Sequence, residues 1–357
     1  MNLIPSESVG SVPRSRELQE AMAAFSQGNL PEREMNKYFD EAVKDTIHRM
    51  KNTGSPIISD GEQTKSSFVT YPLDGLTNLA SDGISIPFED GHTRQLPKLT
   101  KGPFHYSTYA GSYLPRAKKY TTLPLKQAVI SASAMSLLYP SEGLADYTQQ
   151  QFIIDLVNQS VADIRSCFDN GAHHVQVDFT EARLAIKLDP SKALLKQFID
   201  LNNQVLSNFS YLERQRIGFH TCPGGDHDST HSGDVDYAEL IPLFLTLNSG
   251  NFYMQMASEK NPTKALKIIG ENIQPNQRVY IGVIDVINEA IETPQMVYER
   301  IMAAAEYIPL NQLGTTDDCG FSPFSDDMAT SRDTAFAKIT ARIEGTKMAA
   351  EKLKNKA

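Results

Sequence analysis

The stretch QQFIIDLVNQSVADIRSCFDNGAHHVQVD (150–178) is the clearest indication of the fold class, because it places a long amphipathic helix directly before a buried strand. Apolar residues recur at three- and four-residue steps from Ile153 to Phe168, which is the spacing of one helix face, and Gly171 marks the end of the helix. The segment HHVQVD (173–178) is short and rich in valine and is typical of a buried strand. This stretch therefore predicts one helix–strand unit of an α/β fold.

The same alternation continues to the C-terminus. Helices are predicted at 190–209, 237–247, 262–273, 293–308 and about 327–354, and strands are predicted at 216–220, 251–256, 278–285 and 311–316. Strict alternation of strands and helices at this spacing favours a parallel sheet.

Three upstream segments complete a predicted set of eight strands. PIISD (56–60) follows a long predicted helix (32–52), and QAVISAS (127–133) and FHYSTYAG (104–111) are the other two candidates. We therefore predict an α/β fold of the (β/α)8 TIM-barrel type, with an N-terminal helical extension and a long loop insertion, about 62–125, after the first strand. A doubly wound open sheet is the alternative, although no strand is followed by a glycine-rich phosphate-binding turn.

The sequence contains no internal repeat or linker. We therefore expect a single catalytic barrel domain over 1–357, in which residues 1–54 form a segment and helices that pack on the barrel.

Composition excludes several classes of protein. The chain has 34 Lys and Arg against 43 Asp and Glu, a net charge of −9, which argues against nucleic acid or an anionic membrane as a partner. No apolar run reaches the length of a transmembrane helix, and the N-terminus lacks the pattern of a secretory signal. Three widely spaced cysteines do not form a disulfide framework, so we expect a cytoplasmic protein.

Residues whose side chains can bind a metal or act as acids, bases or nucleophiles follow several of the predicted strands. In a TIM barrel the carboxyl ends of the strands form the active site. The residues at these ends are Asp60, Glu62, Asp178, His220, Cys222, Asp285, Asp317, Asp318 and Cys319. Glu62, Asp178 and Asp285 can each bind a substrate ammonium group, act as a base or pair with a cationic side chain.

The His-x-Cys pair is the most specific of these patterns. Side chains two residues apart on a strand share a face, so His220 and Cys222 can bind one ion together. Cys319 follows the last predicted strand and faces the same mouth. One nitrogen and two sulfur ligands favour zinc, and three protein ligands with an open position are typical of a catalytic site. The alternative is that both cysteines are buried apolar residues and His220 is a core histidine. We expect His227 and His231 to lie in a solvated loop.

Taken together, the motifs resemble the cobalamin-independent methionine synthase family, in a short form that contains only the C-terminal catalytic barrel. The matching motifs are VGSVPRS (9–15), SDGEQTKSSFV (59–69), HVQVD (174–178), GFHTC (218–222), GVIDV (282–286) and DDCGF (317–321). The resemblance implies a methyltransferase that moves a methyl group to a zinc-bound homocysteine thiolate and forms methionine.

The resemblance also implies roles for individual residues. His220, Cys222 and Cys319 correspond to metal ligands, and Gln255, Glu259 or water takes the place of the family's fourth ligand, a glutamate. The catalytic set also includes Asp285. The family's amino-acid site corresponds here to Val9, Gly10, Ser11, Glu62 and Asp178.

The methyl donor stays open. The resemblance implies a methyl-folate, as in 5-methyltetrahydropteroyltriglutamate–homocysteine S-methyltransferases, but the chain has no tryptophan on which a folate would stack. The family's proton-donating histidine after the seventh-strand aspartate is also missing, because the run there is Asp285, Val286, Ile287 and Asn288. A methyl-corrinoid protein is the other expected partner. The alternative functions are a related zinc-dependent alkyltransferase or carbon–sulfur lyase that uses another thiol, and a non-catalytic protein that binds sulfur amino acids.

Overall fold

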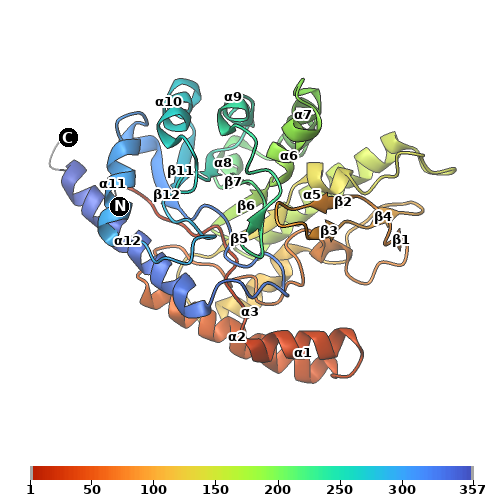
Figure 1. Ribbon diagram of the computed structural model, residues 1–357. Coiled ribbons are helices and arrows are strands. Elements are labelled where there is room, and N and C mark those ends of the chain that lie inside the picture. The colour runs from red at the N-terminus through yellow and green to blue at the C-terminus, as the bar shows by residue number, and fades with distance from the viewer. Residues whose placement is uncertain (1–2, 355–357) are drawn as a thin grey trace.

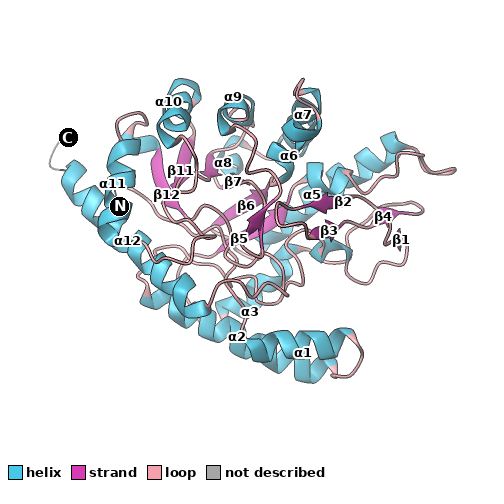
Figure 2. Ribbon diagram, in the orientation of Figure 1, coloured by secondary structure: helices cyan, strands magenta, loops and turns pink. Residues whose placement is uncertain are grey.

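The structure is a computed structural model that describes residues 3–354. Its centre is one sheet of six parallel strands, each hydrogen-bonded to its neighbours in the chain (Figure 2). The strands are β5 (Lys126–Ile130), β6 (His174–Asp178), β7 (Ile217–Thr221), β10 (Asn251–Met254), β11 (Arg278–Gly282) and β12 (Leu313–Thr316). The prediction of a parallel sheet is confirmed, because every neighbouring pair of these strands is parallel. Almost all of their residues are buried, as expected for a parallel sheet covered by helices.

Helices follow the strands and cover the outside of the sheet (Figure 1). The longer ones are α1 (Arg16–Ser26), α2 (Glu32–Asn52), α5 (Gln149–Asp169), α6 (Glu181–Leu188), α7 (Ala193–Leu206), α10 (Pro262–Asn272), α11 (Pro294–Ala304) and α12 (Arg332–Lys354). The short ones are α3 (Leu114–Lys118), α4 (Ala132–Ser136), α8 (Tyr211–Arg214) and α9 (Ile241–Phe244). The predicted helix at 237–247 is shorter than expected: a 3₁₀ turn (Tyr237–Glu239) comes first, and α9 then begins at Ile241 with Pro242 in its first turn.

Two irregular segments extend the sheet to eight positions. Ser6 forms a parallel bridge with Thr315 beside β12, and Ile58 forms one with Leu125 beside β5. The two segments also meet each other, because the Val12 amide donates to the Gly61 carbonyl at 3.1 Å. Eight positions of a (β/α)8 ring are therefore occupied.

One strand prediction is wrong. Residues 104–109 are irregular and Ala110–Tyr113 form a 3₁₀ helix, so the segment 104–111 is not a strand. Aromatic rings in this segment pack against α5 instead, as Phe104 does against Phe152. The eighth position belongs to the segment around Ser6, so part of the N-terminal 54 residues lies in the ring itself rather than on its surface.

The predicted insertion after the segment 56–60 is present and carries two small antiparallel pairs. β1 (Leu79–Ala80) pairs with β4 (Lys98–Leu99), and β2 (Ser85–Pro87) pairs with β3 (Thr93–Gln95). The β2–β3 hairpin reaches the barrel mouth, where the Glu89 amide donates to the Thr230 carbonyl at 3.0 Å. A third small pair, β8 (Gly225–Asp226) with β9 (Ser229–Thr230), lies in the loop after β7. No helix within residues 3–354 is both long and apolar enough to span a membrane.

Candidate active site

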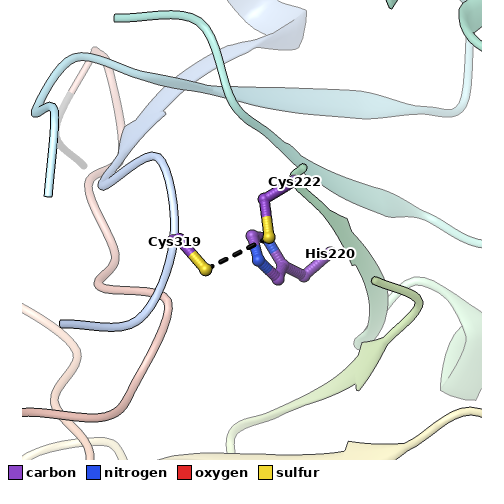
Figure 3. A group of neighbouring side chains, drawn as sticks. All are labelled: His220, Cys222 and Cys319. Atoms are coloured by element: carbon purple, nitrogen blue, oxygen red, sulfur yellow. Dashed lines mark hydrogen bonds between the residues drawn. The ribbon is translucent and has the colours of Figure 1, made fainter. Parts of the chain in front are cut away.

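Three side chains from two strand ends converge at the mouth of the ring. His220 lies on β7, Cys222 follows it directly, and Cys319 lies in the loop after β12 (Figure 3). One potential ligand atom from each residue lies within 4.8 Å of the other two, and all three residues are buried. The two sulfur atoms are 3.1 Å apart. The predicted convergence of these residues on one point is therefore present in the structure.

The orientation of His220 leaves one ring nitrogen free. Its Nδ1 lies 3.3 Å from the Tyr253 carbonyl oxygen, which can only accept, so Nδ1 carries the proton. Nε2 is buried and has no hydrogen-bond partner among the described residues. A neutral imidazole held through Nδ1–H presents Nε2 as a metal ligand. The Gly224 amide also donates to Cys222 Sγ at 3.3 Å.

The hydrogen bond between the two thiols shifts their pKa values in opposite directions. The hydrogen bond from Cys319 and the nearby His220 lower the pKa of Cys222 well below its usual value, despite burial. The same hydrogen bond, together with burial, raises the pKa of Cys319. Burial alone would lower the pKa of His220, but the Cys222 thiolate raises it. A second thiolate in this buried space is unfavourable without a cation, so the donor set fits a divalent metal ion.

A further candidate donor, Gln255, directly follows the neighbouring strand β10. In the register of β7 and β10, Tyr253 is opposite His220 and Met254 is opposite Thr221, and the Gln255 amide donates to the Thr221 carbonyl at 3.3 Å. Side chains alternate along a strand, so Gln255 projects to the same side as Tyr253 and His220. Its Oε1 is buried and has no partner among the described residues.

The amide orientation of Gln255 is determined by its neighbours. Gln255 Nε2 lies 2.7 Å from Ser258 Oγ, and that hydroxyl donates to Asp318 Oδ2 at 2.6 Å. Because the hydroxyl proton is used for Asp318, Ser258 accepts from the Gln255 amide group, and Oε1 is left free. Glu259, the other protein candidate for a fourth ligand, instead pairs with Arg183 at 2.6 Å.

A narrow pocket joins the cysteine–histidine cluster to the predicted amino-acid site. Val9, Ser11, Glu62 and Asp178 line this pocket together with His220 and Cys319. Gly10 does not line it, and its carbonyl accepts a hydrogen bond from Ser59. Four of the five predicted substrate-binding residues therefore face one space.

The two carboxylates of this pocket have different partners. Glu62 Oε1 accepts from Lys65 Nζ at 2.9 Å, and both side chains are buried. Asp178 accepts from the Gln176 amide group at 2.7 Å. Burial raises the pKa of Asp178 to about 6, although His220 opposes the shift. Lys65 was not predicted as part of the site. Its position three residues after Glu62 could have indicated that the two side chains pair.

Comparison with known proteins identifies the family. A family model described as "Cobalamin-independent synthase, Catalytic domain" matches residues 4–338. The chain belongs to this family.

Curated relatives and a solved structure agree with this assignment. The chain is 21% identical over 355 residues to a methionine synthase of Sulfurisphaera tokodaii, covering 99% of this chain and 95% of the relative. It is also 21% identical over 356 residues to a methionine synthase of Saccharolobus solfataricus, covering 99% and 97%. A B12-independent methionine synthase from Shewanella sp. W3-18-1, solved in complex with selenomethionine, superimposes with a TM-score of 0.79 at 19% identity, covering 99% of this chain and 100% of that chain. This likeness confirms the fold class.

The structure of this cobalamin-independent synthase domain differs from two expectations, which concern Asp285 and His231. Asp285 lies outside the inner pocket and borders a separate cavity with Gln255 and Ile287. One of its carboxylate oxygens accepts from the Ile287 amide at 3.0 Å. The loop prediction for His231 is wrong in one respect, because His231 is buried and its ring packs on Gly224 and Phe88. His227 is partly exposed, as expected.

Proposed function

We propose that this protein transfers a methyl group to the thiol of homocysteine and so forms methionine. The observation that carries the proposal is the convergence of His220, Cys222 and Cys319 at one end of a pocket that also holds Glu62 and Asp178. A thiol-activating centre and two carboxylates in the same pocket suit a substrate with both a thiol and an ammonium group. A sulfonate thiol would be repelled by these carboxylates. The relatives named methionine synthase support the same reaction.

We propose zinc as the cofactor, held by His220 Nε2, Cys222 Sγ and Cys319 Sγ. The unpartnered Gln255 Oε1 is the fourth donor, since Glu259 is engaged by Arg183. A bound zinc ion deprotonates a coordinated thiol, which otherwise has a pKa of about 8.5 and is mostly protonated at neutral pH.

The chain's own residues bind and orient the substrate. Asp178 and the oxygen of Glu62 that Lys65 leaves free accept hydrogen bonds from the ammonium group. The Ser11 hydroxyl and backbone amides near Val9 bind the carboxylate. These contacts point the thiol toward the cysteine–histidine cluster, and burial of the cluster excludes water from it.

Metal analysis combined with a homocysteine assay tests the proposal. Purified protein should contain about one zinc per chain and convert homocysteine to methionine with a suitable donor, whereas Cys319→Ala should lose both metal and turnover. Cys167→Ala is the matched control, because Cys167 is buried on α5 away from the cluster and should change neither. Retained turnover in metal-free Cys319→Ala protein would contradict the proposal.

We also propose a reducing, cytoplasmic location. All three cysteines are free, and two of them belong to the proposed metal centre. Cell fractionation would test this location.

A further inference from the structure

A second cavity, here called the outer cavity, adjoins the inner pocket and offers a route by which a methyl donor could reach it. It has a volume of about 470 Å³ and shares Phe68, Thr180, Gly224 and Gly225 with the inner pocket. The remaining walls come from the segment 66–70, from the β2–β3 hairpin with Phe88 and the residue after it, from His231 and from the segment 324–326 with Phe324. A group placed here lies next to the loop that holds Cys222, because the Gly224 amide donates to that sulfur.

This outer cavity offers no free positive charge. Arg94 is the one arginine or lysine among its described lining residues. Its guanidinium bonds both Asp226 and Asp326, at 3.0 Å and 2.9 Å from Nη2, and it lies over the Phe324 ring at 4.1 Å. An anionic tail, such as the glutamates of a folate, would therefore find no cationic partner here.

The neighbouring cavity on the other side of the same loop is acidic. Five carboxylates line it against two permanent cations: Glu89, Asp90, Asp228, Glu259 and Asp285 against Arg183 and Lys260. Arg183 is already paired with Glu259 at 2.6 Å. The field at this mouth therefore attracts cations and repels anions.

We propose that the methyl donor is a small onium compound, a methylsulfonium or a methylated quaternary ammonium, that reaches the thiol through the outer cavity. This inference rests on the proposed homocysteine methylation. Phe68 lines both spaces, so its ring is close enough to contact the cationic methyl groups. The acidic neighbouring cavity raises the local concentration of the cation.

The chemistry of this step balances without an added acid. The substrate thiolate forms a bond to the methyl carbon, and the bond from that carbon to the sulfonium sulfur or ammonium nitrogen breaks. The electron pair of the broken bond stays on the leaving group, which departs as a neutral thioether or tertiary amine. A thiolate and a cation are consumed and neutral groups form, so an apolar, poorly solvated site favours the reaction. An N-methyl amine donor would instead need a proton on its departing nitrogen.

A donor panel tests the inference with the zinc-loaded full chain and homocysteine. S-methylmethionine and glycine betaine represent the two onium classes, and methyl-tetrahydrofolate and methylcobalamin represent the others. Methionine should form with at least one onium donor at a rate at least about tenfold above the folate and cobalamin donors. Turnover with methyl-tetrahydrofolate or methylcobalamin but with neither onium, or no turnover with any donor while homocysteine still binds, would overturn the onium assignment and leave homocysteine binding intact.

A separate experiment tests whether the outer cavity binds its ligand through a positive charge on that ligand. Choline and its neutral isostere 3,3-dimethyl-1-butanol differ in the cationic centre, and choline should inhibit at least about tenfold more strongly. Phe68→Leu should raise the KM for the onium donor about tenfold and change the KM for homocysteine less, while Phe25→Leu on exposed α1 is the matched control. Equal inhibition by the two isosteres would overturn the inference. If cobalt-substituted protein shows no spectral change with homocysteine, the proposed function itself fails, and this inference fails with it.

Discussion

Glu7 is a residue whose charge depends on its position inside the ring. Its Oε1 lies 2.8 Å from His174 Nδ1, its Oε2 accepts from the Tyr253 hydroxyl at 2.7 Å, and Lys126 Nζ is 3.9 Å away. Burial would raise the pKa of Glu7, but His174 and Lys126 hold it at about 2, below its ordinary value of 4.5. Because the folded-state pKa is lowered, the ionised carboxylate stabilises the fold above pH 4.5, and this stabilisation is lost as the pH falls toward 2.

Glu7→Gln should therefore lower the free energy of unfolding by about 3 kcal/mol at pH 7 and by much less at pH 3. Urea unfolding at the two pH values measures the difference. Glu20→Gln is the control. Glu20 pairs with Arg16 on the exposed surface of α1, so its substitution should lower the free energy of unfolding by under about 0.5 kcal/mol. An equal loss for Glu7→Gln at both pH values would show that its charge does not matter.

Gln255 is the proposed fourth ligand of the metal centre, so substituting it should change how tightly the protein holds zinc. Gln255→Leu removes the free Oε1 but keeps most of the side-chain volume, so zinc retention against a chelator should fall at least about tenfold. Ser258→Ala should have a smaller effect in the same direction, because it removes only the group that orients the amide. Gln295→Leu on the exposed surface of α11 is the control. Unchanged retention in Gln255→Leu would show that Gln255 is not a ligand.

The loop after β7 forms part of the wall of both the inner pocket and the outer cavity. Gly224 has φ +74°, and a Cβ there would lie 1.8 Å from His231 Nε2. The same residue donates its amide to Cys222 Sγ. Its backbone conformation and its packing both require glycine.

Gly224→Ala should therefore displace the loop, lower the melting temperature and weaken zinc retention. Gly75→Ala provides a matched comparison, since Gly75 has φ +81° with no atom within 4 Å of the added Cβ. It should cost about 1 kcal/mol from backbone strain alone and leave zinc retention unchanged. Thermal unfolding and chelator competition distinguish the two variants, and identical behaviour would argue against a role for the His231 contact.

At the scale of the whole molecule, the ring depends on its first residues. Arg342 of α12 donates to the Glu7 carbonyl at 2.9 Å and to the Ser8 hydroxyl at 2.8 Å, and its Nη1 lies 2.7 Å from Asp317. The N-terminal segment therefore joins the last helix, the last strand and the segment around Ile58.

Deleting residues 1–8 should abolish cooperative thermal unfolding, because it opens the ring beside β12. It also removes the nearby Glu7 carboxylate from the buried Lys126 and the Glu7 and Ser8 contacts from the buried Arg342. Calorimetry and far-UV circular dichroism measure this. A truncated protein that loses no more stability than Glu7→Gln would show that the segment is dispensable for closure.

The alternation of strands and helices could be predicted from the amino-acid sequence alone, because helical and strand periodicities are local and strong from 150 onward. The sequence also placed His220, Cys222 and Cys319 at strand ends, since the order of parallel strands brings their carboxyl ends together.

The segment that fills the eighth position of the ring becomes apparent in the folded structure alone. The segment around Ser6 has no strand pattern and is held by single bridges and by Arg342, so no local signal marks it. The same holds for Gln255, because its free Oε1 depends on the bond between the nearby Ser258 hydroxyl and Asp318, which is distant in the chain. It holds also for Asp285, which borders a different cavity from Asp178. Side-chain partners at a barrel mouth come from loops that meet only when the ring closes, so they cannot be derived from local sequence patterns.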